Sequence, residues 1–388
     1  MAVAFFASGF AFASWAARIP QVRARLDVTP GVLGLILLCI AIGSAVSIPL
    51  AGWVIVRIGE ARTVAVTAII AAAGLAVVAL GYTHGIPPVA AGLFCFGFGS
   101  GAWDVAMNVQ GAAVEQAIGR SVLPRMHAAW SIGTVAGAGA GTVLVAAAVP
   151  VTADLLVVAV AVAVAVPAAT RSFLRSAPPR RQARRGGGVL EAWTERRTLL
   201  IGLFVLCVSV IEGTGNDWLS LGVIQGYHAP AAVGTAAFAL FLAAMTAGRW
   251  FGPRLIDRYG RVRVLRPAAA LALAGLLMLG LVDVLAVAFL GAAAMGLGTA
   301  LGFPVGLSAA ADDPARAAGR VSAASSLGYG AFLAGPPLIG FIADHAGVLH
   351  ALACAGVLLV AALFLSQATA PITPGPGPGL LTEPSPEA

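Results

Sequence analysis

The sequence predicts an all-helical membrane protein that crosses the bilayer twelve times, in two pseudo-symmetric bundles of six helices. Hydrophobic residues make up 60% of the chain and charged residues only 10%, whereas soluble proteins carry roughly 25% charged residues. The apolar runs are long enough to cross a bilayer as helices, which takes about 20 residues each. Short motifs of the first half also return, in the same order, in the second half.

The apolar runs define twelve predicted spans. In the first half they cover about 2–17, 30–56, 63–82, 88–113, 126–149 and 152–169. In the second half they cover about 199–222, 231–255, 264–282, 285–309, 321–343 and 348–367. The predicted domains are therefore an N-terminal six-helix bundle (1–170), a basic cytoplasmic linker (171–198), a C-terminal six-helix bundle (199–368) and a disordered tail (369–388).

The recurring motifs predict an internal duplication. Residues 57–62 resemble 258–263, 97–100 resemble 296–299, 119–120 match 319–320, and 131–133 resemble 326–328. Two related six-helix halves that face each other are typical of transporters that work by alternating access, with the solute site between the halves.

The arginines predict the orientation. The chain has no lysine, and 19 of its 23 basic residues fall on one side of the predicted topology, with Arg18, Arg23 and Arg25 on the other. Because cytoplasmic loops carry the excess of basic residues, both termini are expected in the cytoplasm, and the protein in the cytoplasmic (inner) membrane. The positive charge is thus explained by topology, and we expect no nucleic-acid partner.

The fourth span contains the first candidate functional residues. Asp104 lies inside an apolar helix, where a carboxylate is costly and is by default a functional candidate. Asn108 follows one turn later on the same face. Gly97, Gly99 and Gly101 precede them and are expected to let a neighbouring helix approach closely.

The seventh span contains the second group. Glu212 and Asn216 are one turn apart, and Asp217 points elsewhere around the helix. Gly213 and Gly215 lie between them and are expected to weaken the helix, as in the broken helices at transporter sites. The alternative is that these acids only pair with Arg249, which lies within the eighth predicted span, or with helix ends.

Other residues of the spans have two interpretations. His127, at the start of the fifth span, fits a structural hydrogen bond better than a proton relay. Tryptophans are able to stack on a ring-shaped solute or to serve only in packing and at the membrane interface; they are Trp15, Trp103, Trp130 and Trp218. No cofactor or metal site is expected. An Asp104/Glu212 hydrolase and a membrane receptor are the other classes considered, but the duplicated plan and the short Pro/Gly tail favour neither.

The loops carry a family resemblance. The stretch from Gly252 through residues 257–263 resembles the loop signature of the major facilitator superfamily, and residues 52–62 resemble it in the first half, with Val56 in place of the usual Asp. The resemblance implies gating residues at Asp257, Arg258, Arg261, Arg57 and Arg62.

A narrower resemblance joins the chain to the fucose-permease-like branch of proton symporters. It rests on residues 49–52 and on residues 104–108, where the branch has an acid followed by Asn one turn later. That branch has a second acid late in the first span, where this chain has Ser14. The resemblance implies that spans 1, 4, 7 and 10 line the solute cavity. The solute-contacting residues are then expected to be Phe10, Ser14, Trp103, Asn108, Trp130, Asn216 and Asp217.

These observations predict a secondary transporter and not an enzyme. The leading interpretation is proton-coupled symport of a sugar-like polar solute by a monomer, with Asp104 and Glu212 as proton-coupling residues. The alternative is proton-antiport efflux of a drug or metabolite. The expected partners are the small-molecule solute, protons and the lipid bilayer.

Overall fold

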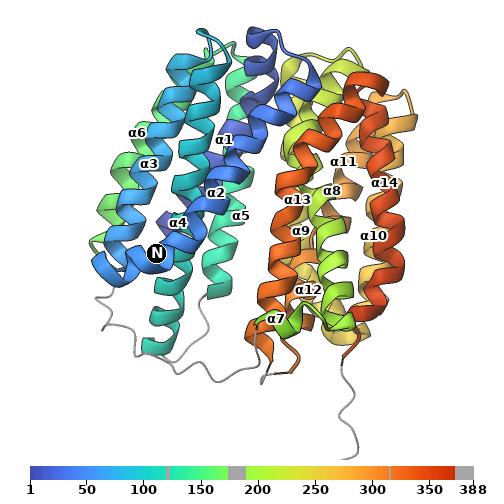
Figure 1. Cartoon of the computed structure of the whole chain (residues 1–388). Helices are drawn as coiled ribbons and strands as arrows, with labels where there is room; N and C mark the ends of the chain where they lie inside the picture. Colours follow the sequence, from blue (N-terminus) through green and yellow to red (C-terminus); the bar gives the residue numbers. More distant parts are fainter. Residues whose placement is uncertain (119–122, 174–188, 314–315, 372–388) are drawn as a thin grey trace, which may run out of the picture.

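The computed structural model describes residues 1–118, 123–173, 189–313 and 316–371. Across these ranges every regular element is a helix, and there is no strand. Twelve of the helical segments are long and apolar enough to cross a membrane, counting α11 and α12 as one. The predicted fold class is confirmed: the chain forms two six-helix bundles side by side (Figure 1).

The bounds of the helices are as follows. The first bundle holds α1 (Ala2–Leu26), α2 (Pro30–Ile58), α3 (Glu60–Gly81), α4 (Ile86–Ile118), α5 (Leu123–Ala146) and α6 (Val151–Thr170). After the short α7 (Val189–Ala192), the second holds α8 (Arg196–Gly226), α9 (Ala231–Tyr259), α10 (Arg261–Leu281), α11 (Leu285–Thr299), α12 (Gly302–Ala310), α13 (Ala317–Ala346) and α14 (Val348–Leu365), with a final 3-10 turn, η1 (Ser366–Thr369).

The two ends of the molecule are distinguished by the helix termini that lie there. The linker end is the one at which α1 begins, α6 ends and α8 begins, at the bottom of Figure 1. The far end is the opposite one, where α1 ends near Asp27, α9 begins near Pro230 and α13 ends near Gly347.

The bundles repeat one packing pattern. In the first, α4 packs against both α2 and α3, and in the second α11 packs against both α9 and α10. Gly97 lies directly on the backbone of α2 and Gly99 on that of α3, while Gly296 and Gly298 lie in the same way on α9 and α10. A side chain at these positions would collide with the neighbouring backbone. The close approach predicted from the glycines is therefore confirmed, and it recurs as the duplication requires.

The repeated loop motif also has one conformation. Gly59, between α2 and α3, has φ 81°, and Gly260, between α9 and α10, has φ 85°. A positive φ strains any residue with a Cβ, so glycine is required at both turns. The matching residues 57–62 and 258–263 thus build the same turn in each half.

The first helix is longer than the sequence predicts. The predicted span ends at residue 17, before Arg18 and Pro20, but α1 continues to Leu26 with Pro20 inside it. Arg18 stays within the bundle because its Nε donates to Asp154 Oδ2 of α6 at 2.6 Å, with both side chains almost fully buried. A charged residue does not end a span when it is paired inside the bundle. The partner of Arg18, Asp154, is 136 residues away, so the local sequence does not reveal the pair.

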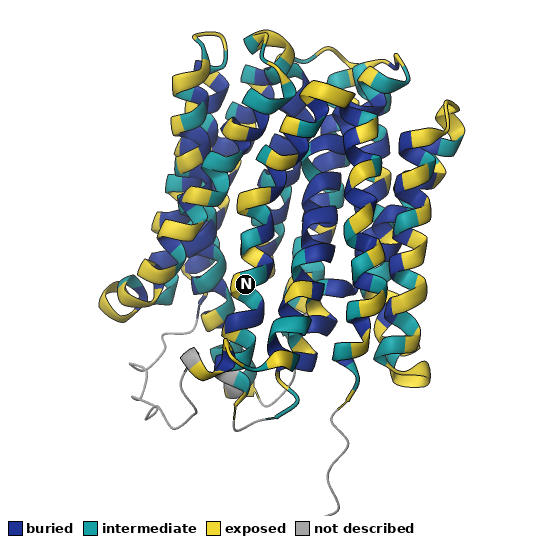
Figure 2. Cartoon of the chain, turned by 45° about the vertical axis from the view of Figure 1, so that its right-hand side comes forward, coloured by how far each residue is buried: buried dark blue, intermediate teal, exposed yellow. Residues whose placement is uncertain are grey.

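The outer surface of the bundles is apolar. Figure 2 shows exposed residues along the outward sides of the helices and buried residues between them. Val157, Val160 and Val164 form one exposed stripe on α6, with Val157 68% exposed. Such a surface suits contact with lipid.

Parts of the predicted linker and tail lie outside the described residues. These are residues 174–188 of the linker and the tail from residue 372. Residues 119–120 of the repeated motif, between α4 and α5, lie outside them as well. Where the linker is described, α7 forms within it and α8 begins at Arg196, before the predicted start of the span at 199. The domain boundaries at 170 and 198 remain predictions.

Candidate functional site

Asp104 and Asn108 meet on α4 as their spacing predicts. The Asn108 amide donates to the Asp104 backbone carbonyl at 2.9 Å and to its Oδ1 at 3.2 Å. Both residues are partly buried. A carboxyl hydrogen-bonded by a neutral amide keeps access to other partners, so this pair is a candidate proton or solute site.

His127 of α5 extends this pair. Its Nε2 lies 3.0 Å from the Asn108 carbonyl oxygen Oδ1. Because an amide oxygen only accepts hydrogen bonds, the facing ring nitrogen is the protonated one. The Phe5 ring meets the imidazole edge-on, with ring centroids 5.3 Å apart. Asp104, Asn108 and His127 therefore form one hydrogen-bonded row across α4 and α5.

Glu212 of α8 has a different environment, because Arg249 of α9 neutralises it. Arg249 Nη2 donates to Glu212 Oε1 at 2.7 Å. The pairing that the sequence left open as an alternative is thus present for Glu212. Arg249 also lies 6.0 Å from the centre of the Trp130 ring of α5, which belongs to the other bundle.

The broken helix of the second bundle is not the predicted one. The glycines at 213 and 215 were expected to interrupt the seventh span, but α8 runs unbroken through both. Gly215 instead makes room for the Phe241 ring of α9. The break lies between α11 and α12, where the Ala300 carbonyl accepts from Arg249 Nε at 3.4 Å. A side chain distant in sequence therefore supports the carbonyl at the break.

The two groups face each other across the bundle interface. Helix α5, which carries His127, packs against α9, which carries Arg249, and the Arg249 guanidinium faces the Trp130 ring of α5. The candidate site therefore combines the row Asp104–Asn108–His127 of the first bundle with the Glu212–Arg249 pair of the second.

The other predicted solute residues divide by burial. Trp103 and Ser14 are fully enclosed in this conformation, at 0% and 2% exposure. Phe10, Trp130, Asn216 and Asp217 are only partly buried. Asn216 Oδ1 has no hydrogen-bond partner within the described ranges. The partly buried group is thus the one available to a solute here.

The structure contains the hydrogen bond expected of His127 and, for Glu212, the pairing with Arg249 that the sequence left open. What the sequence does not reveal is that the partner of His127 is Asn108, 19 residues away. Arg249 carried a signal in the sequence, since it lies well inside the eighth predicted span. An intramembrane cation needs a partner, which points to one of the intramembrane acids.

The predicted gating residues lie at the linker end. Arg261 bonds Asp312 at 2.7 Å and Ser308 at 3.1 Å. Arg57 stacks on Trp53, with 3.7 Å from Cζ to the ring centre. Asp257, Arg258 and Arg62 are exposed. Their gating role was predicted for the conformation that is closed at the linker end, and it remains a prediction.

The bundles are fastened to each other at the far end. Asp344 of α13 accepts from the Gly31 backbone N–H at 3.0 Å and from Thr29 Oγ1 at 3.2 Å, both at the start of α2. Gly34 of α2 lies against the backbone of Pro336 in α13. At the linker end, the ion pairs among the described residues join members of the second bundle to one another or to residues 191 and 195 just before it. This conformation is thus held closed at the far end.

Comparisons with known proteins agree with this architecture. The family model of the Major Facilitator Superfamily matches residues 1–332. An uncharacterized MFS-type transporter of Yersinia pestis is 30% identical over 362 residues, covering 92% of each chain.

Solved structures show the same fold. A mutant of the nucleoside transporter NupG matches with a TM-score of 0.77 and 15% identity, covering 95% of this chain and 98% of that one. A bacterial homologue of the human lysosomal transporter Spinster, in an inward-facing and unoccupied conformation, matches with a TM-score of 0.73 and 13% identity, covering 95% of both chains. The chain is therefore a multi-pass membrane protein that belongs to the major facilitator superfamily of secondary transporters.

Proposed function

We propose that the protein moves a small polar, sugar-like solute together with protons, and that Asp104 is the proton carrier. The observation that carries this proposal is the contrast between the two acids. Glu212 is paired with Arg249 at 2.7 Å, whereas within the described ranges no arginine pairs with Asp104, which has the Asn108 amide instead. An unpaired carboxyl between two bundles is the group best placed to exchange a proton as its surroundings change.

The mechanism follows from alternating access. When the cavity opens, water stabilises the charged carboxylate of Asp104, and when it closes, the loss of water favours the neutral acid. The Asn108 amide is able to bond either form, because its N–H donates to a carboxylate oxygen or to the carbonyl oxygen of the neutral acid. His127 holds the Asn108 oxygen and thereby fixes which atom faces Asp104. Binding of a proton at Asp104 is thus transmitted to the surface that a solute would touch.

The solute class is inferred from the polar groups. Asn108 and Asn216 offer donors and acceptors, and Trp130 offers an apolar face, which suits a neutral hydroxylated ring. The resemblance to the fucose-permease-like branch supports a sugar. Because a nucleoside transporter is among the structural neighbours, nucleosides are the second class of solute to be tested. A thermal-shift screen against sugars, nucleosides and amphipathic drugs would identify the solute.

The topology is part of the same proposal. We place the linker end, with the protein's termini, in the cytoplasm of a cell whose inner membrane holds the transporter, because most arginines are at that end. The conformation that is fastened at the far end then faces inward.

The test separates binding from coupling. In proteoliposomes, Asp104→Asn mimics the protonated acid, so it should keep solute counterflow yet lose accumulation driven by a pH gradient. Glu212→Gln, which removes the charge paired with Arg249, serves as the comparison. If Asp104→Asn still accumulates solute in response to the pH gradient, or if only Glu212→Gln is uncoupled, the proposed role of Asp104 is wrong.

The same preparation separates symport from the alternative, proton-antiport efflux. Symport predicts accumulation on the alkaline side of the membrane, and antiport on the acidic side. The direction of accumulation in wild-type vesicles decides between them.

A further inference from the structure

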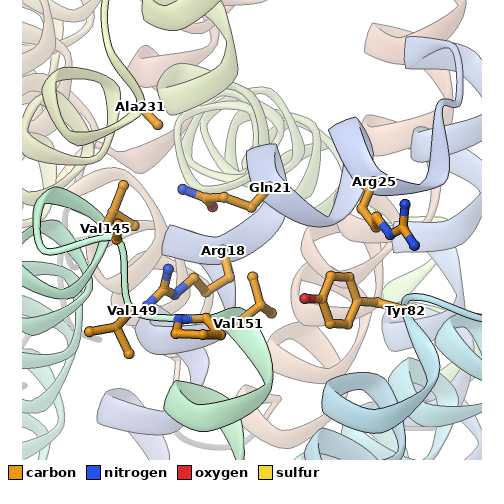
Figure 3. A pocket seen from close by; sticks show the side chains of 10 residues that line it. Arg18, Gln21, Arg25, Tyr82, Val145, Val149, Val151 and Ala231 are labelled. Carbon is orange, nitrogen blue, oxygen red and sulfur yellow. The ribbon is translucent and has the colours of Figure 1, made fainter.

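A cavity at the far end is separate from the candidate functional site. It has a volume of about 360 Å³ and lies among the end of α1, Tyr82 after α3, the turn between α5 and α6, and the first residue of α9. Its polar lining comes from Arg18, Gln21, Arg25 and Tyr82 (Figure 3). Its remaining walls are apolar, with Val145, Val149 and Val151 prominent among them.

Two of the polar residues carry unsatisfied groups. Arg18 is 1% exposed, and its Nε is bonded to Asp154, but its Nη2 has no partner within the described ranges. Both the amide oxygen and the amide nitrogen of Gln21 are also buried without a partner. Leaving buried polar groups unpaired costs about 1–3 kcal/mol each, so a protein normally provides them with a ligand or with water.

The charge of the cavity is one positive unit. Asp154 neutralises Arg18, and Arg25 forms no ion pair within the described ranges. A guanidinium offers a planar pair of donors that matches the two oxygens of a carboxylate. The valine walls, in turn, match a short hydrocarbon group.

We propose that this cavity binds a small, water-soluble monocarboxylate with a short apolar body. The carboxylate lies between the guanidinium groups and Gln21, and the hydrocarbon lies against the valines. Because Ala231 of α9 also lines the cavity, a bound molecule touches both bundles. It therefore stabilises the conformation that is closed at the far end and slows the transport cycle.

The test is calorimetric titration of the full-length protein in lipid nanodiscs. Hexanoate is the probe, with hexanol as its uncharged analogue and inorganic phosphate as an anion without an apolar body. We expect saturable binding of hexanoate and none of the other two. Equal binding of hexanol would mean that the cavity binds apolar molecules without selecting for a carboxylate. The absence of hexanoate binding means that it holds only water. Either result overturns the proposal.

The variants spare the buried ion pair, since removal of Arg18 would leave Asp154 unpaired. Gln21→Leu and Arg25→Gln should each weaken hexanoate binding by about tenfold, as expected for a lost hydrogen bond to a charged group. Arg23→Gln removes the same charge from the same helix end but does not line the cavity, so it is the matched control. Unchanged affinity in both Gln21→Leu and Arg25→Gln would contradict the assigned site.

A second control tests independence from the transport site. Asp104→Asn should bind hexanoate like the wild-type protein. In wild-type proteoliposomes, external hexanoate should slow solute counterflow, and in Gln21→Leu it should slow it less. Loss of hexanoate binding in Asp104→Asn would place the carboxylate at the transport site and overturn the proposal of a separate one.

Discussion

Asp104 and Glu212 show how neighbouring side chains decide the role of an acid inside a membrane. The two residues look alike in the sequence, since each is an acid inside an apolar span with Asn one turn later. In the fold, Glu212 has an arginine at 2.7 Å, and Asp104 has an amide at 3.2 Å. The first is half of an ion pair that links α8 to α9, and the second has no arginine partner within the described residues, as the proposed proton carrier requires.

The Glu212–Arg249 pair predicts a coupled effect on stability. Arg249→Met leaves Glu212 as an unpaired charge, which is costly in a poorly hydrated site. Combining it with Glu212→Gln removes that charge. We expect Arg249→Met to lower the midpoint of thermal unfolding more than the double variant does, with a coupling energy of roughly 0.5–3 kcal/mol. Strictly additive effects would mean that the pair contributes nothing.

The residues that could be predicted were those whose signal is local. Asp104 and Asn108 bond to each other because residues four apart share a helix face. His127, Arg249 and the Arg18–Asp154 pair needed the packing of separate helices, the last across 136 residues of sequence. Charges inside apolar spans identify candidates from the sequence, but only the fold pairs them.

At the scale of helices, glycine patterns predicted close packing but not helix breaks. Gly97 and Gly99 lie where α4 meets two other backbones, as their spacing suggested. The glycines at 213 and 215 leave α8 intact, and the break occurs after Thr299 instead. Ala300 is a residue type that favours helices. Its carbonyl is held by Arg249, a tertiary contact that no local pattern reveals.

The start of α8 is tied to α13 by one carboxylate. Glu195 accepts from Arg320 Nε, from Arg320 Nη2 at 3.1 Å and from Arg316 at 3.0 Å. The hydrogen bonds from Arg320, with smaller contributions from Thr198 and Arg316, outweigh the effect of burial and lower the pKa of Glu195 from 4.5 to about 2. The folded protein therefore holds this carboxylate ionised at acidities where the unfolded chain protonates it.

This shift predicts a pH dependence. Because the pKa of Glu195 is lower in the folded protein than in the unfolded chain, its ionised carboxylate contributes fully to the free energy of unfolding above pH 4.5. That contribution is lost as the pH falls from 4.5 toward about 2. Glu195→Gln should thus be less stable than wild type in thermal unfolding at pH 7, with the gap narrowing below pH 4.5. Glu191→Gln is the control, since Glu191 lies 3.9 Å from Arg316 and is exposed. A gap that stays constant down to pH 3 would contradict the assignment.

At the scale of the whole molecule, the fold was predictable but the conformation was not. Twelve apolar runs and a repeated loop motif are enough to specify two six-helix bundles. The two ends of the transport path differ only in a few contacts between the bundles, and small free energies decide which end is closed. Asp344 and its partners at the start of α2 are such contacts, and they join residues 313 apart in sequence.

The hydrogen bonds of Asp344 should therefore influence the balance between the conformations that are closed and open at the far end. Asp344→Ala removes both hydrogen bonds to α2, so the population open at the far end should rise. Spin labels at Ala24 and His350, both exposed at that end, should then report longer distances in pulsed electron resonance. Asp283→Ala is the control, because Asp283 is an exposed far-end acid near Tyr227, within the second bundle. Identical distance distributions in Asp344→Ala and wild type would show that this contact does not hold the end closed.

The most direct test of proton coupling through Asp104 is to record proton movement during solute flow. Proteoliposomes that enclose a pH-sensitive dye receive an inward solute gradient and no initial pH gradient. The account predicts that the lumen of wild-type vesicles acidifies as the solute enters, and that Asp104→Asn lets the solute enter with no change in pH. Acidification by Asp104→Asn at the wild-type ratio of protons to solute would contradict it.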